Sequence, residues 1–173
     1  KSKYIKAICL DTVDSTNNVV KALASDGCDE GLLVCATRQT AGRGRLGRTF
    51  LSNVGGVYFS LCLRPNDTAD ATLLITVAAA VAAARAIETV SGKSCEIKWV
   101  NDIYMNGKKV CGILTEGCFN QNGNLDFAVL GVGINLIKPE YAVISTGVCH
   151  GTYMHPREEA LNNLIAVGSD IYR

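Results

Sequence analysis

An Asn-Gly pair joins two apolar runs near the middle of the chain, and it restricts the fold more than any other local feature. Glu96 to Tyr104 and Lys108 to Cys118 both have the composition of β-strands, and Asn106-Gly107 lies between them. Asn and Gly both accept the left-handed backbone that a tight hairpin turn needs. The two runs are therefore predicted to form a hairpin, and Leu125 to Leu136 is predicted to pair next in antiparallel fashion.

The rest of the chain supplies the other elements of a mixed fold. Three further apolar runs predict strands: Tyr4 to Leu10, Gly31 to Thr37 and Gly56 to Arg64. Three segments predict helices: one that follows the N-cap candidates Asp14 to Asn17 and stops near Asp26-Gly27, an Ala-rich one from Ala71 to Val90, and one that begins near Pro156. This order predicts an α+β domain in which helices cover one face of a mixed, largely antiparallel sheet.

The length and charge of the chain limit what it can be. With 173 residues it is predicted to form a single domain, and 48% hydrophobic with 19% charged residues is a globular composition. The net charge of +1 gives no global field to hold a polyanion, so no DNA partner is expected. The apolar stretch from Leu73 to Ala84 ends at Arg85 and is shorter than the roughly 20 residues that cross a bilayer, so no membrane association is expected.

The eight cysteines favour buried, reduced thiols. They occupy positions 9, 28, 35, 62, 95, 111, 118 and 149, without a C-x-x-C pair, and most lie in apolar runs. Disulfides and zinc are the less favoured alternatives. The N-terminal residues lack the pattern of a signal peptide, so a cytoplasmic location is expected.

The segment from Gly42 to Arg48 alternates arginines with glycines. Three guanidinium groups and a backbone without bulky side chains suit a phosphate or another anion. An RGG-type nucleic-acid tract and a solvated basic loop are the alternatives. The segment is not a Walker A loop, because G-x-x-x-x-G-K-S/T is absent.

A lysine at the hairpin is the second candidate for chemistry. By period-2 alternation Lys109 shares a face with Cys111 and Ile113, whereas Lys108 points the other way. Lys109 is therefore the predicted pocket lysine, although an exposed hairpin lysine is the simpler interpretation when this segment is taken alone. Without further context, Trp99 is interpreted as a core residue.

Two weaker signals complete the set. Gly131 and Gly133 lie inside a predicted strand that ends on Asn135, and glycines there often mark a bulge or a ligand that approaches the backbone. The polar segment from Ser15 to Asn17 is explained by helix capping when it is taken alone. His150 and His155 have no partner at a metal-ligand spacing.

Four blocks together resemble the catalytic domain of the biotin protein ligases (biotin-[acetyl-CoA-carboxylase] ligases), over about residues 4 to 172. They are Asp14 to Asn17, Arg38 to Ala41 with the Arg-Gly segment, Lys98 to Asp102 with Lys109 to Leu114, and Gly131 to Asn135. The resemblance implies the biotin-lipoate ligase fold, which is similar to class II aminoacyl-tRNA synthetases. It implies that biotin is activated with ATP to biotinyl-5'-AMP and transferred to a lysine of a biotin carboxyl carrier protein.

The resemblance also implies roles for residues of this chain. The biotin-binding residues are Ser15, Thr16, Asn17, Gln39, Arg43, Gly44, Arg45, Lys109 and Gly112. The ATP-binding residues are Arg45, Arg48, Phe50, Asn101, Lys109 and Asn135. Lys109, Arg43 and Arg45 are the expected catalytic residues, and Asp102 is a candidate to orient or deprotonate the acceptor lysine. Phe50 replaces the usual tryptophan, and Val100 the usual proline.

Some expectations concern partners, and some alternatives stay open. Mg²⁺ is expected on the ATP phosphates, with no protein ligands identified, and a homodimer is possible. The sequence contains neither the N-terminal helix-turn-helix of some relatives nor the small C-terminal β-barrel, so one catalytic domain is expected over 1–173. The alternatives are a biotin or biotinyl-AMP binding protein without transfer activity, a lipoate ligase, and an RNA-binding Arg-Gly protein.

Overall fold

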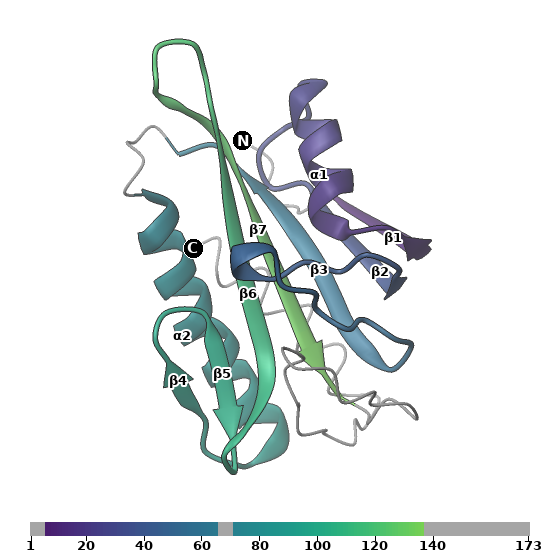
Figure 1. Ribbon diagram of the computed structural model, residues 1–173, viewed down its shortest axis with the longest axis vertical. Coiled ribbons are helices and arrows are strands. Elements are labelled where there is room, and N and C mark those ends of the chain that lie inside the picture. The colour runs from purple at the N-terminus through teal and green to yellow at the C-terminus, as the bar shows by residue number, and fades with distance from the viewer. Residues whose placement is uncertain (1–5, 66–70, 137–173) are drawn as a thin grey trace.

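The computed structural model describes residues 6–65 and 71–136, and in these ranges the chain forms one seven-stranded sheet with two helices (Figure 1). The strand order is β1-β2-β3-β7-β6-β5-β4. Only β1 and β2 pair in parallel, and the other neighbours are antiparallel. The predicted α+β fold with a mixed, largely antiparallel sheet is therefore confirmed. The elements are β1 (Ala7–Val13), α1 (Thr16–Ser25), β2 (Leu33–Gln39), β3 (Gly56–Leu63), α2 (Ala71–Ser91), β4 (Glu96–Lys98), β5 (Asp102–Met105), β6 (Lys108–Phe119) and β7 (Leu125–Asn135).

The Asn-Gly hairpin is confirmed, but the strand before it is divided. Asn106 and Gly107 have φ of 53° and 72° and join β5 to β6, which pair antiparallel. The single strand predicted from Glu96 to Tyr104 is wrong: β4 and β5 pair with each other across a turn. The turn is stabilised from outside, because the backbone N–H of Ile113 donates to the carbonyl of Asn101 at 2.8 Å. The local pattern of apolar residues from Glu96 to Tyr104 cannot predict this contact, because Ile113 lies outside it.

The two helices pack on opposite faces of the sheet, which corrects the expectation that helices cover one face. Helix α2 packs on a core that includes Leu61 of β3 and Leu130 of β7. Helix α1 packs on a second cluster that includes Cys62 and Val129, the neighbours of those residues in the same strands. Successive side chains in a strand point to opposite faces, so β3 and β7 are buried on both sides. Burial on both sides explains why the sequences of β3 and β7 are nearly continuous apolar runs.

Helix α2 is long and apolar. Its segment Thr72–Ser91 has a mean hydropathy of 1.8, so it is long and apolar enough to cross a membrane by length and composition alone. This differs from the expectation above, which considered only the uncharged run from Leu73 to Ala84. The core helix of a soluble protein passes the same test. In this fold the buried residues Ala83 and Ile87 pack on the sheet, within the largest of the three core clusters of the described residues.

The described cysteines are free thiols, but they are not uniformly buried. Cys62 and Cys111 are fully buried, whereas Cys9 is exposed, against the expectation for it. Burial raises the pKa of the Cys62 thiol to about 12 and that of Cys111 further. Both thiols are therefore protonated at neutral pH. Cys149, His150, His155 and the helix predicted from Pro156 lie outside the described residues.

Candidate functional site

A cavity of about 200 Å³ opens between the start of α1, the Arg-Gly segment and strands β6 and β7. It lies on the α1 face of the sheet, where Gly112, Gly131 and Gly133 form part of its wall. The residues that line it are Ser15, Thr16, Asn17, Gln39, Arg43, Gly44, Arg45, Leu46, Arg48, Thr49, Phe50, Asn101, Asp102, Lys109, Gly112, Ile113, Leu114, Gly131, Val132 and Gly133. Nearly every residue that the sequence singled out is therefore at one site. Asn135, at the end of β7, is not among them.

The Arg-Gly segment is a short, ordered excursion from the end of β2. The N–H of Gly44 donates to the carbonyl of Arg48 at 2.7 Å, and the N–H of Phe50 donates to the carbonyl of Gly42 at 2.9 Å. A Cβ at Gly42 would overlap the Phe50 carbonyl, so only glycine fits there. Isolated bridges between Gln39 and Ser52 and between Arg43 and Thr49 close the excursion. The arginines are therefore presented on a defined backbone.

The uncharged end of the cavity is formed by the start of α1 and the end of β2. Gln39 Oε1 accepts from the backbone N–H of Thr16 at 2.8 Å and from its hydroxyl at 3.1 Å. Gln39 Nε2 donates to Ser52 Oγ at 2.8 Å. Ser15 is the N-cap of α1 and is 2% exposed, yet its side chain makes no cap hydrogen bond. The described residues give the Ser15 hydroxyl no partner, so it is available to a ligand.

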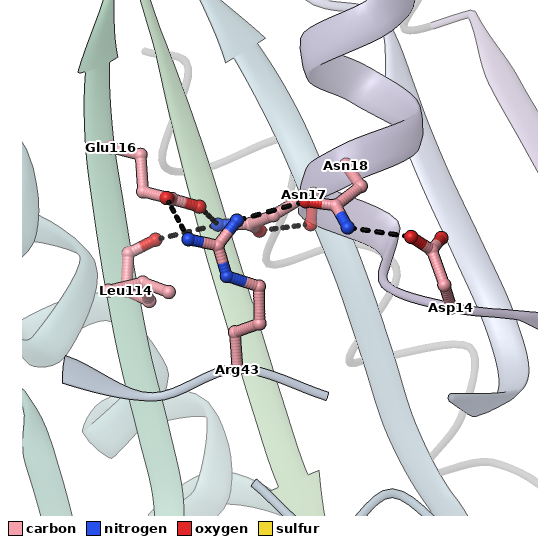
Figure 2. A network of polar contacts seen from close by, with 7 residues as sticks. Asp14, Asn17, Asn18, Arg43, Leu114 and Glu116 are labelled. Atoms are coloured by element: carbon pink, nitrogen blue, oxygen red, sulfur yellow. Dashed lines mark hydrogen bonds and ion pairs between the residues drawn. The ribbon is translucent and has the colours of Figure 1, made fainter. Parts of the chain in front are cut away.

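Asn17 links α1 to the sheet beside this end (Figure 2). Its Oδ1 accepts from the hydroxyl of Ser60 at 2.6 Å, and its Nδ2 donates to Glu116 at 2.8 Å. A carboxylate only accepts hydrogen bonds, so the orientation of the Asn17 amide is fixed. A Cβ at Gly131 would overlap Asn17 Oδ1. The glycine in β7 therefore makes room for this side chain.

Arg43 extends the same network to the Arg-Gly segment. Its guanidinium forms an ion pair with Glu116 at 2.9 Å and donates to Asn18 Oδ1 at 2.9 Å. Asn18 Nδ2 donates to Asp14 at 2.6 Å. That hydrogen bond is the largest cause of a lowered pKa of the Asp14 carboxyl, and the hydrogen bond from the backbone N–H of Ser15 is the next largest. The network thus joins the segment, α1 and β6 through charged groups (Figure 2).

The charged end of the cavity is built around Lys109. Its Nζ lies 2.7 Å from Asp102 Oδ1, and the residue is only 7% exposed. Asn101 Nδ2 donates to the same carboxylate oxygen at 3.0 Å, and Arg45 donates to Asn101 Oδ1 at 3.3 Å. The Lys109 ammonium also lies 5.8 Å from the centre of the Phe50 ring. Arg45 and Lys109 therefore reach the same end of the cavity from two different segments.

Lys109 is the pocket lysine, but the alternation that predicted it is wrong. A β-bulge interrupts the pairing of β5 and β6 between Ile103 and Tyr104. Lys109 consequently lies on the face of Gly112, where a Cβ would come within 3.2 Å of Lys109 Nζ. Cys111 and Ile113 belong to the core under α2 on the other face.

One further interpretation is wrong, namely that of Trp99 as a core residue. Lys108 is exposed, as expected. Trp99 is 74% exposed, so its interpretation as a core residue is wrong. The peptide bond between Trp99 and Val100 is cis. Val100, in the position of the usual proline, is the buried residue of this turn.

Phe50 explains the other glycines of the wall. A Cβ at Gly112 or Gly133 would meet its ring, at 2.9 Å and 2.5 Å respectively. The ladder that pairs β7 with β3 and β6 has no bulge at Gly131 or Gly133. Of the two explanations for strand glycines, the bulge is therefore wrong, and the approach of a ligand stays a prediction. The groups that approach these glycines in the structure are the side chains of Asn17 and Phe50.

Several residues of the site were missed in the sequence, among them Asn18, which accepts from Arg43, and Thr49, which lines the cavity. Ser52, Ser60 and Glu116 hold Gln39, Asn17 and Arg43 in place, and each lies inside or beside an apolar strand. Glu116 is the one with a usable signal. The other residues from 110 to 119 are uncharged, so Glu116 is a lone carboxylate in an apolar strand. Because a buried charge is normally paired, such a residue indicates a cationic partner.

The comparisons agree with this geometry. The model of the biotin/lipoate A/B protein ligase family matches residues 9–135. The bifunctional ligase/repressor BirA of Bacillus subtilis is 43% identical over 127 residues, which are 73% of this chain and 39% of that protein. The biotin--[acetyl-CoA-carboxylase] ligase of Paracoccus denitrificans is 37% identical over 80% of this chain and 58% of its own length.

Solved structures with a similar fold include biotin protein ligases. The biotin protein ligase of Aquifex aeolicus in complex with biotin and ATP has a TM-score of 0.77 and 30% identity, covering 97% of this chain and 70% of that chain. The chain spans about two fifths of the length of the Bacillus relatives that it matches. With the family model matched over most of its length, this chain belongs to the biotin/lipoate A/B protein ligase family.

Proposed function

We propose that the chain activates biotin with ATP to biotinyl-5'-AMP and transfers the biotinyl group to a lysine of a biotin carboxyl carrier protein. One observation carries the proposal: a single cavity has an uncharged hydrogen-bonding end and a cationic end. Biotin has the matching form, with a neutral ureido ring at one end and a carboxylate at the other. The names of the curated relatives favour biotin over lipoate.

The uncharged end suits a urea. A ureido group offers two N–H donors and one carbonyl acceptor, so its site needs both kinds of partner in a largely dry slot. The hydroxyl of Ser15 can donate or accept, whereas the hydroxyl of Thr16 donates its proton to Gln39 and can only accept from the ring. We assign the ring to Ser15, Thr16 and Gln39, with Asn17 and the backbone from Arg43 to Arg45 alongside.

The cationic end suits adenylation. At this end the cavity wall carries Arg45, Arg48 and Lys109 against one carboxylate, that of Asp102. Arg43 also lines the cavity, but its charge is paired with Glu116. A carboxylate oxygen of biotin attacks the α-phosphorus of ATP, the bond to the pyrophosphate oxygen breaks, and the mixed anhydride forms. Negative charge gathers around that phosphorus, and Lys109 with Arg45 would stabilise it as fixed donors and cations do in other sites.

The nucleotide is assigned to the same end. We place the phosphates near Arg45 and Arg48, the adenine against Phe50, and Asn101 and Asn135 nearby. Asn135 is the weakest of these assignments because it does not line the cavity. Within 6–65 and 71–136 no three His, Cys, Asp or Glu side chains cluster as a metal site. We therefore propose that Mg²⁺ arrives on the phosphates of ATP.

The function is tested by pyrophosphate release. Incubation with biotin and ATP is expected to release pyrophosphate and to form biotinyl-AMP, detected by mass spectrometry. Addition of a biotin carboxyl carrier domain should then yield a biotinylated lysine. Release with lipoate in preference to biotin would support the lipoate ligase, and biotin binding without release would support the binding protein. Salt-dependent RNA binding without either result would support the Arg-Gly alternative.

Asp102 gives a prediction on the second half-reaction. The acceptor amine attacks the anhydride only when neutral, and with a pKa near 10.4 about one amine in a thousand or fewer is neutral at pH 7. We expect Asp102→Asn to slow transfer from preformed biotinyl-AMP by roughly tenfold or more, because Asp102 would orient or deprotonate that amine. The ion pair with Lys109 predicts a smaller fall in adenylation as well. Unchanged transfer from isolated biotinyl-AMP would remove Asp102 from this role.

A further inference from the structure

We propose that Glu116 is a positioning residue that holds the Arg-Gly segment against α1 and so retains biotin and biotinyl-AMP in the cavity. The inference rests on the proposed function for its ligand, but not for its geometry. Glu116 does not line the cavity, so it acts through the residues that do. Neither the spacing of the motifs nor the family resemblance indicated it.

The two carboxylate oxygens of Glu116 have different partners. Oε2 accepts from Asn17 Nδ2 at 2.8 Å, and Oε1 pairs with Arg43 Nη2 at 2.9 Å (Figure 2). The side chain of Glu116 is 21% exposed and that of Arg43 is 45% exposed, whereas Asn17 is buried, so water screens the ion pair more than the hydrogen bond with Asn17. One carboxylate on β6 thus fixes a side chain of α1 and a side chain of the Arg-Gly segment together.

The side chain of Arg43 attaches the segment to α1 and β6, and the side chain of Arg45 attaches it to Asn101 at 3.3 Å. The guanidinium of Arg43 contacts Glu116 and Asn18, which places it between β6 and α1. Two positions further on, Arg45 is exposed, and Leu46 is 89% exposed. Both residues line the cavity, as Arg48 does. Release of Arg43 would leave the hydrogen bond from Arg45 to Asn101 as the side-chain contact of this part, so we expect the part that carries Arg45 and Arg48 to become more mobile.

The substitution Glu116→Gln separates the two contacts. The side-chain carbonyl oxygen can still accept from Asn17, but the amide nitrogen is a donor facing the donors of Arg43. The ion pair is lost while the size of the side chain is kept. Glu96→Gln is the matched control, because Glu96 is an exposed carboxylate of β4 at the far edge of the sheet.

In the first arm, pyrophosphate release and the dissociation of biotinyl-AMP are measured for wild type, Glu116→Gln and Glu96→Gln. We expect Glu116→Gln to raise the KM for biotin and the dissociation rate of biotinyl-AMP about fivefold each, with kcat changed less than about twofold, in line with a partly exposed charge-assisted contact. Glu96→Gln should match wild type. In an Arg43→Gln background, adding Glu116→Gln should have little further effect, because the pair is already broken.

The second arm needs no ligand. Trypsin cleaves after Arg45 and Arg48, and cleavage in a folded protein follows the population of the open segment. We expect cleavage at these two sites, followed by mass spectrometry, to be about fivefold faster in Glu116→Gln than in Glu96→Gln, with equal melting temperatures. Equal cleavage and equal KM in the two variants would overturn the role of Glu116. A wild type without pyrophosphate release would instead overturn the proposed function, and the cleavage rates would still decide the role of Glu116.

Discussion

Replacement of Lys109 with alanine is expected to reduce the rate of biotinyl-AMP formation by roughly 10²- to 10³-fold, the usual cost of removing a fixed donor from charge that develops in a transition state. Lys109 lies 2.7 Å from Asp102, is nearly buried, and lines the cationic end of the cavity. Its ammonium is therefore held in place before substrate arrives. Water entering the space left by alanine would have to reorganise during the reaction, which is why the loss is large.

The adjacent lysine is the matched control for this prediction. Lys108→Ala removes the same charge from the same strand, but Lys108 is exposed, so its adenylation rate should stay within about twofold of wild type. Single-turnover formation of biotinyl-AMP separates this step from product release. Loss of the partner of Asp102 will also destabilise the fold, so Lys109→Met, which keeps the apolar stem, is measured alongside. Normal adenylation by either Lys109 variant would refute the role.

Most of the residues at the site were predictable because they lie in short, chemically distinctive blocks. The segments Asp14 to Asn17, Gly42 to Arg48 and Lys98 to Asp102 each combine polar groups with glycines or apolar neighbours in a way that ordinary loops rarely do. Long apolar strands and the Asn-Gly turn also predicted most of the sheet. The boundaries of the strands moved by up to three residues, as with β1, which runs to Val13 rather than Leu10.

The failures have a common physical cause, which is contact between distant parts of the chain. The bulge that turns Lys109 toward the cavity belongs to the pairing of β5 with β6 and has no mark in the alternation. Glu116 reaches Asn17 across 99 positions, and Ser60 reaches it across 43. The opposite packing of α1 and α2 likewise follows from strands buried on both faces. Such residues become visible only when the strands are side by side.

The glycine beneath Asn17 gives the second large effect. Gly131→Ala is expected to lower the free energy of unfolding by about 2–4 kcal/mol, through a combination of overpacking and lost buried hydrogen bonds. Gly131 pairs with Ser60 in β3 and Leu114 in β6, so its backbone cannot move away from the new methyl group. Asn17 must rotate instead, and Ser60 and Glu116 each lose one partner, while their contacts with Thr16 and Arg43 remain.

Urea denaturation of the wild type and the variants tests this explanation. Gly117→Ala, also inside a strand, is the control, because its methyl group would meet side-chain carbon atoms at 3.0 Å or more and would displace no hydrogen-bonded atom that lies closer. It should cost less than about 1 kcal/mol. In an Asn17→Ala background the change at Gly131 should cost little, since the atom that it would displace is absent. An equal cost of Gly131→Ala in the two backgrounds would show that the glycine serves the strand itself and not the side chain of Asn17.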